Sequence, residues 1–177
     1  MSKFSLHSID TAPGESKTIL VDVQKGFGFV PNLMRVMAES PPTLRAYTTL
    51  MRLFEKSAFD TAEKEIILLA VSKENECGYC LSAHAKVAAM KGVPLEVIEA
   101  VRAGAPLADG RLQLLVEFVR SIVATRGWPD QALVERFYAL GYTQQQHLEI
   151  VFAVAMKTLS NYVNHAADTP IDEALAA

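Results

Sequence analysis

The chain has 177 residues, of which 50% are hydrophobic and 21% are charged, and its formal net charge at pH 7 is −3. This composition excludes a disordered, collagen-like or low-complexity protein, and the near-neutral charge does not favour nucleic acid or an anionic membrane as a partner. The length predicts a single domain over residues 1–177. The chain does not begin with an apolar signal-like segment, and charges interrupt its long apolar stretches, so we expect a cytoplasmic protein.

Glycine and proline separate segments in which apolar residues recur every three or four positions, a pattern that predicts an all-α protein. An irregular segment is expected over residues 1–30, followed by a short helix that begins at Pro31 and stops before Pro41. Asp60 and Glu63 form a capping box before a helix so apolar that we expect it to be central. The further predicted helices and the final tail cover residues 43–56, 61–74, 78–91, 94–102, 107–125, 129–140, 144–166 and 167–177.

The two cysteines of the chain, Cys77 and Cys80, form the pattern Cys-x-x-Cys-x-x-x-His with His84. At these spacings the three side chains lie along one face of a helix. Cysteines at i and i+3 in a first helical turn come within disulfide distance, and the positive end of the helix dipole favours a thiolate there. We expect His84 to hydrogen-bond or deprotonate Cys80, which makes Cys80 the candidate nucleophile.

Glu65 shares a helix face with apolar residues, so we expect its carboxyl group to be partly buried, with a pKa raised toward the range useful for proton transfer. A short turn between this helix and the next predicts antiparallel packing, which brings Glu65 near the cysteine helix. Two other interpretations of the cysteines stay open: a zinc half-site completed by Glu65 or His147, or inert core thiols. A second polar cluster either lines the same pocket or anchors the last helix; it comprises His147, Asn161, Asn164 and His165.

The set Glu65, Cys77, Tyr79, Cys80 and His84 resembles the signature of the AhpD-like alkylhydroperoxidases in the carboxymuconolactone decarboxylase superfamily. The resemblance extends from about Gly28 to Pro170, because three further segments are similar to the peroxidase-related members: Pro31-Asn-Leu-Met34, Gly92-Val-Pro94 and Asn161-Tyr-Val-Asn-His165. It implies an all-α, AhpD-like helical bundle that assembles into a homo-oligomer, as trimers or hexamers.

The same resemblance implies a mechanism and partners. Cys80 attacks an organic hydroperoxide or hydrogen peroxide, and Cys77 resolves the sulfenic acid into a disulfide. Glu65 and His84 relay protons, and Tyr79 contributes nearby. No metal or cofactor is implied; the reductant is an external dithiol, such as a lipoyl group or a thioredoxin-like protein. Two alternatives remain: a decarboxylase-type acid/base enzyme that uses Glu65 and His84 without thiol turnover, and a non-enzymatic redox sensor whose dithiol switches an interaction.

Overall fold

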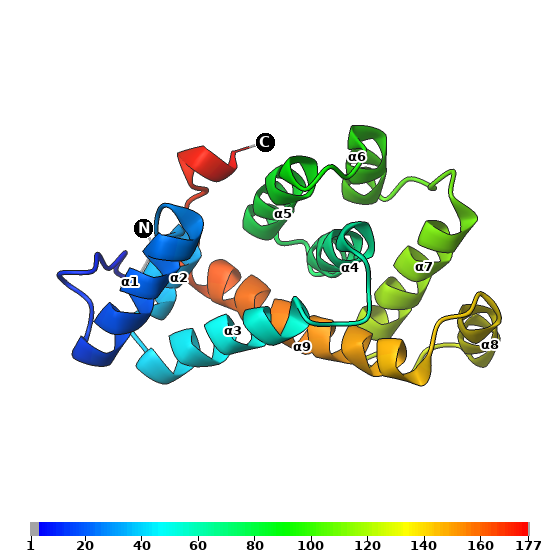
Figure 1. Cartoon of the computed structure of the whole chain (residues 1–177), viewed down its shortest axis with the longest axis horizontal. Coiled ribbons are helices and arrows are strands. Elements are labelled where there is room, and N and C mark those ends of the chain that lie inside the picture. The colour runs from blue at the N-terminus through cyan, green and yellow to red at the C-terminus, as the bar shows by residue number, and fades with distance from the viewer. Residues whose placement is uncertain (1–3, 177) are drawn as a thin grey trace.

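The computed structural model describes residues 4–176, and over that range it contains nine α-helices, a short 3₁₀ helix and no β-strand (Figure 1). The predicted all-α fold is confirmed, and no helix in this range is long and apolar enough to cross a membrane. Residues 1–3 of the predicted N-terminal segment and residue 177 of the predicted tail lie outside the described residues. The elements are α1 Gly14–Phe27, α2 Asn32–Met37, α3 Pro41–Phe54, α4 Thr61–Glu74, α5 Gly78–Met90, α6 Leu95–Ala103, α7 Gly110–Ala124, α8 Gln131–Ala139, α9 Gln144–Ala167 and η1 Glu173–Leu175.

Helix α1 lies in the segment that the sequence predicted to be irregular, and that prediction is wrong. Its N-cap position is occupied by Pro13, whose side chain makes no capping hydrogen bond, so the usual local signal for a helix start is missing. The buried side chains Ile19, Leu20 and Val23 give the helix an apolar face, and α1 contacts α3. Tertiary packing therefore supplies the stability that local propensity does not.

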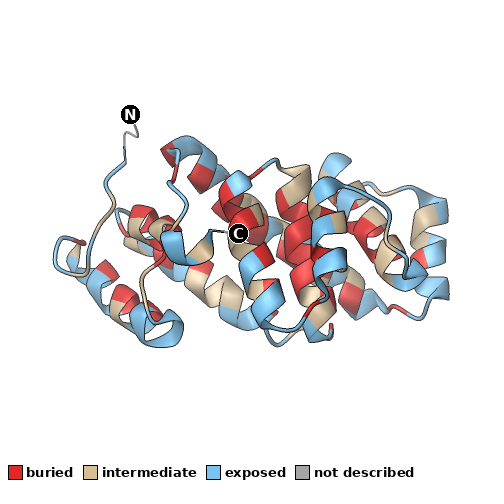
Figure 2. Ribbon diagram, turned by 90° about the horizontal axis from the view of Figure 1, so that it is seen from above, coloured by how far each residue is buried: buried red, intermediate tan, exposed pale blue. Residues whose placement is uncertain are grey.

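Helix α4 occupies the centre of the fold, as its sequence predicted. It contacts α5, α6, α7 and α9, and Figure 1 shows it end-on between them. The predicted capping box between Asp60 and Glu63 is formed, and all residues from Glu65 to Ser72 are buried. The buried positions gather in the middle of the molecule (Figure 2). A helix buried on every side provides a rigid platform for the elements around it.

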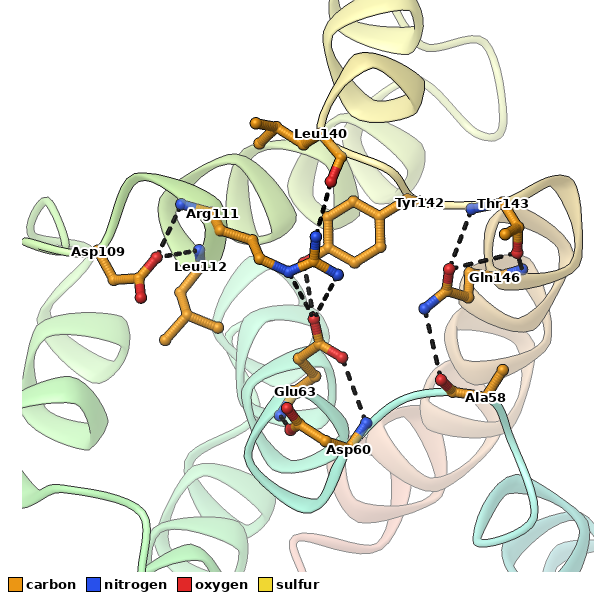
Figure 3. A network of polar contacts seen from close by, with 10 residues as sticks. All are labelled: Ala58, Asp60, Glu63, Asp109, Arg111, Leu112, Leu140, Tyr142, Thr143 and Gln146. Atoms are coloured by element: carbon orange, nitrogen blue, oxygen red, sulfur yellow. Dashed lines mark hydrogen bonds and ion pairs between the residues drawn. The ribbon is translucent and has the colours of Figure 1, made fainter.

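A polar network joins the start of α4 to α7 and to the α8–α9 loop (Figure 3). Glu63 Oε1 accepts hydrogen bonds from the Tyr142 hydroxyl at 2.9 Å and from Arg111 Nε and Nη2, both at 3.3 Å. Arg111 also donates to the Leu140 carbonyl at 2.7 Å, and its guanidinium lies 4.0 Å from the centre of the Tyr142 ring. Because Glu63 is only 5% exposed, these bonds are partly shielded from water.

The replacement Glu63→Gln is expected to lower the free energy of unfolding by about 1–2 kcal/mol, because bonds to a charged acceptor are stronger than bonds to a neutral amide. Urea unfolding of Glu63→Gln, Arg111→Met and the double variant measures the coupling. The double variant should lose less stability than the two single variants added together, because both remove the same interaction. Strictly additive losses would show that the two side chains act independently.

The turn between α4 and α5 places Cys77 at the start of α5. Glu76 adopts a left-handed φ of 55°, its N–H donates to the Lys73 carbonyl, and the N–H of Cys77 donates to the Ser72 carbonyl. These two bonds form a Schellman motif that ends α4, and three residues separate α4 from α5. Glu65, in the first turns of α4, reaches Lys91 just beyond the end of α5, which confirms the predicted antiparallel packing.

Candidate active site

Cys77 and Cys80 are free thiols at the start of α5, with 1% and 2% of their surfaces exposed. The hydrogen bond from the Cys77 thiol holds the pKa of Cys80 well below its usual range, against the opposing effect of burial. The same bond, together with burial, raises the pKa of Cys77. Nearby positive charge on Lys157 further lowers the pKa of Cys80. This asymmetry favours Cys80 as the thiolate and Cys77 as its hydrogen-bond donor.

Glu65 projects from α4 toward α5, and only 2% of its side chain is exposed. One carboxylate oxygen lies 3.4 Å from His84 Nδ1, and the other lies 2.7 Å from Lys91 Nζ. Burial by itself raises the pKa of Glu65, but the hydrogen bonds from His84 and Lys91 outweigh it and the pKa is lowered. The expectation of a raised pKa is therefore wrong, because the sequence analysis did not place Lys91 beside this carboxylate.

The second ring nitrogen of His84 is hydrogen-bonded to Lys157. Its Nε2 lies 2.9 Å from Lys157 Nζ, on α9, and Lys157 lowers the pKa of Cys80. The expected direct bond between His84 and Cys80 is not formed in the described part of the chain; the ring of His84 instead lies between Glu65 and Lys157. Because Nδ1 faces a carboxylate and Nε2 faces an ammonium, these partners assign His84 the tautomer with the proton on Nδ1.

Three polar residues of α9 face the cysteines: Lys157, Ser160 and Asn164, at i, i+3 and i+7. Asn164 Nδ2 lies 3.3 Å from the sulfur of Cys80, and Ser160 Oγ lies 4.0 Å from it. Sequence reasoning assigned no role in the site to Lys157 or Ser160, and it left the role of Asn164 open. The available signal was a polar stripe at helical spacing in a helix whose neighbouring residues are largely apolar.

The other members of the predicted polar cluster lie outside the site. His147 Nδ1 is 2.8 Å from the Tyr138 hydroxyl, among aromatic rings of α7 and α8, so it is not placed to complete a zinc site with the cysteines. His165 is exposed and stacks near Tyr162, while Asn161 accepts a hydrogen bond from Asn75. Within residues 4–176 no three His, Cys, Asp or Glu side chains are grouped as a metal site.

Tyr79 holds the segment that follows α9 against α5. Its hydroxyl donates to Asp172 at 2.6 Å and accepts from the N–H of Leu33 at 3.3 Å; burial and the bond to Asp172 raise its pKa. The Ser82 hydroxyl donates to the carbonyl of Leu175 in the same segment. This geometry gives Tyr79 an anchoring position, and its predicted contribution to the chemistry stays a prediction.

Two adjoining chambers lie beside the cysteines and share His84 as a wall. The larger, of about 230 Å³, is mostly apolar, and its polar lining residues include Lys157 and Glu65. The smaller, of about 70 Å³, reaches Cys80 and is bounded by Leu175. A cavity of about 150 Å³ holds benzene, so the larger chamber has room for an apolar group of ring size. The residues common to both chambers are Phe27, Tyr47, Met51, His84 and Val87.

We expect the Glu65→Gln variant to lose less of its free energy of unfolding between neutral and acid pH than the parent protein loses. The pKa of Glu65 is lower in the folded protein than its ordinary value, so its stabilising contribution is complete at neutral pH. That contribution is lost as the pH falls from about 4.3 through the folded pKa, and a glutamine has no such transition. Urea unfolding at neutral and acid pH tests this, with Glu55→Gln as the control, because exposed Glu55 binds the same Lys91. Equal acid sensitivity in Glu65→Gln and the parent protein would contradict the assignment.

Part of the chain matches a known protein family, and the whole fold is similar to solved structures. Residues 41–121 match the model of the carboxymuconolactone decarboxylase family. The structure is similar to an AhpD-core, peroxidase-related protein from Ralstonia eutropha JMP134, with a TM-score of 0.87, 21% identity and coverage of 98% of this chain and 94% of that chain. A peroxidase-related protein from Silicibacter sp. TM1040 gives a TM-score of 0.82 and 22% identity, over 97% and 92% of the two chains.

The debrominase Bmp8, as a cysteine-to-alanine variant in complex with 2,3,4-tribromopyrrole, has a TM-score of 0.81 and 19% identity, over 99% of this chain and 96% of that chain. No curated protein matches the sequence. At such identities the structural likeness establishes the fold, and the family match covers the helices that carry Glu65, both cysteines and His84. The chain therefore has an all-α fold similar to that of the AhpD core, and its residues 41–121 match the carboxymuconolactone decarboxylase family.

Proposed function

We propose that this protein is a thiol-dependent hydroperoxidase that reduces hydroperoxides with the pair Cys80 and Cys77. The observation that carries the proposal is the buried pair of free thiols, with Cys80 at the wall of an apolar chamber and Asn164 Nδ2 3.3 Å from its sulfur. The lowered pKa of Cys80, caused chiefly by its hydrogen bond with Cys77, agrees with it. A stabilised thiolate next to a second thiol has the components for two-electron reduction of a peroxide followed by disulfide formation. Glu65 orients His84 from the opposite side.

The reaction proceeds in two steps. The Cys80 thiolate attacks the terminal oxygen of the hydroperoxide, so a sulfur–oxygen bond forms, the oxygen–oxygen bond breaks and an alcohol leaves after protonation. Cys77 then attacks the Cys80 sulfenic acid, the sulfur–sulfur bond forms, and the oxygen leaves as water. Sulfur loses two electrons and the peroxide gains them. An external dithiol returns the disulfide to two thiols by exchange.

The surroundings of the sulfurs narrow the choice of substrate and reductant. The apolar chambers favour an organic hydroperoxide over hydrogen peroxide, because removing an alkyl or aryl group from water into them is favourable. The reductant must reach sulfurs whose residues are almost fully buried, which favours a slender dithiol such as a lipoyl group over the flat face of a thioredoxin-like protein. No resident cofactor or metal enters this scheme, and a homo-oligomer remains part of the proposal.

The proposal is tested by reducing the protein, adding one equivalent of tert-butyl hydroperoxide, and mapping thiols by alkylation and mass spectrometry while peroxide loss is followed. Because the chain has two cysteines, every lost thiol is assigned to Cys77 or Cys80. The expected result is a disulfide between them in step with one equivalent of peroxide lost. Two free thiols with unchanged peroxide would refute the hydroperoxidase and favour the acid/base enzyme. Slow turnover together with oxidation-dependent binding of a partner would favour the redox sensor.

A second candidate, reductive debromination, is favoured by the likeness of nearly the whole chain to the debrominase Bmp8 and by the ring-sized larger chamber. Two thiols and an aryl bromide would give the arene, hydrogen bromide and the same disulfide, so the electrons balance. Bromide release from a bromopyrrole incubated with the reduced protein tests it directly. Disulfide formation with peroxide but none with the bromopyrrole would leave the hydroperoxidase as the function.

A further inference from the structure

We propose that Lys157 is a catalytic residue, whose ammonium group holds the Cys80 thiolate and protonates the alkoxide that leaves when the peroxide bond breaks. This inference rests on the proposed hydroperoxidase function and deepens it, because it assigns the proton donor of the first step. It is carried by the position of Lys157 on α9: its side chain contacts His84 and lines the larger chamber, and Ser160 and Asn164 on the same helix face contact the sulfur of Cys80.

Lys157 is a buried cation that lacks an acidic partner. It has no measurable exposure, and among residues 4–176 no carboxylate forms an ion pair with it. Burial of an unpaired charge is costly, so buried lysines are paired or serve a function. The sulfur of Cys80 lies against the same face of α9, through its contacts with Ser160 and Asn164, and can supply the missing negative charge. The nearest acidic group in the network is Glu65, which is separated from Lys157 by His84. Glu55 is farther away, because Lys91 lies between it and Glu65.

The arrangement of donors around Lys157 suits proton transfer. An ammonium group has three N–H bonds. One donates to His84 Nε2 at 2.9 Å. Lys157 lowers the pKa of Cys80, so we assign a second to that sulfur. Since Lys157 also lines the larger chamber, the third is available to the oxygen of a bound hydroperoxide. Ser160 and Asn164 lie on the same face of α9 and add polar groups around the sulfur.

The proton inventory of the reaction balances with Lys157 as donor and acceptor. In the first step the thiolate takes the terminal oxygen, the alkoxide leaves with the electron pair of the broken oxygen–oxygen bond, and Lys157 protonates it and becomes an amine. The amine then removes the proton of Cys77, whose thiolate attacks the sulfenic acid. The departing hydroxide recovers that proton from Lys157 and becomes water. Reduction of the disulfide by an external dithiol restores the Cys80 thiolate, the Cys77 thiol and the Lys157 ammonium.

The test compares Lys157→Met with the parent protein by two measurements. The pH dependence of Cys80 alkylation reports the pKa of the thiol, and stopped-flow mixing with tert-butyl hydroperoxide reports the rate of the first step. Methionine has a similar length and removes the buried charge, so the fold is expected to persist. We expect the pKa of Cys80 to rise by at least about one unit, and the rate at neutral pH to fall about 10²-fold.

Two further variants separate the roles. Lys157→Arg keeps the charge but does not lose a proton, so we expect Cys80 to stay a thiolate while the peroxide rate falls. Lys86→Met makes the same chemical change at an exposed position on α5 and should alter neither measurement. If Lys157→Met leaves both the alkylation profile and the peroxide rate unchanged, the inference is overturned. A parent protein that consumes no peroxide, with a raised Cys80 pKa in Lys157→Met, would refute the hydroperoxidase and still support the pairing of Lys157 with Cys80.

Discussion

Replacing Cys80 with serine is expected to reduce hydroperoxide consumption by about 10³-fold or more, because the variant has no thiolate to attack the peroxide. A serine hydroxyl stays protonated at neutral pH, and the hydrogen bond from position 77 that stabilises a thiolate cannot make it a comparable nucleophile. The measurement is the rate of tert-butyl hydroperoxide loss with a dithiol reductant present. The free energy of unfolding, measured in parallel, shows that the loss is chemical, since serine is slightly smaller than cysteine at this buried position.

The Cys80→Ser variant also separates the proposed function from its alternatives. An acid/base enzyme that uses Glu65 and His84 without thiol chemistry would keep its activity, because the bonds among Glu65, His84 and Lys157 do not involve the sulfur. Undiminished peroxide loss by the variant would exclude Cys80 as the nucleophile and with it the two-cysteine mechanism.

Replacing Cys77 with serine is expected to stop the reaction after one equivalent of peroxide, with Cys80 held as a sulfenic acid. The variant keeps the nucleophile but has no thiol to displace the sulfenic oxygen, so the disulfide cannot form. Mass spectrometry after trapping with dimedone measures the sulfenic acid, and a peroxide assay measures the single equivalent. Continued turnover at the parent rate would show that Cys77 is not the resolving cysteine.

Comparison of Cys77→Ser with Cys77→Ala isolates the second role of this residue. Both variants lack the resolving thiol, but only serine retains a hydrogen-bond donor toward Cys80. The hydrogen bond from Cys77 is the main cause of the lowered pKa of Cys80, so that pKa should be higher in the alanine variant than in the serine variant. Equal alkylation profiles in the two variants would assign the lowered pKa to Lys157 instead.

The sequence by itself determined the helices α2 to α9 and the local part of the site. The capping box at Asp60 and the short turn before Cys77 are encoded within a few residues, and both are formed as predicted. The spacing of the cysteines placed them together in the first turn of α5. The same turn made α4 and α5 antiparallel, which brought Glu65 to His84. Each of these features depends on neighbours close in the chain, where periodicity and capping are informative.

Only the tertiary structure decided which charges meet the sulfurs. Lys157 is 73 residues from His84 in the chain, and Asp172 is 93 residues from Tyr79, yet each pair is hydrogen-bonded. The direction of the Glu65 pKa shift depends on Lys91, and α1 depends on packing against α3. Helical periodicity shows which face of a helix is buried, but many packings of the same helices satisfy it. The faces that meet are selected by the packing of the whole core, so the partner of a buried charge is not encoded near it.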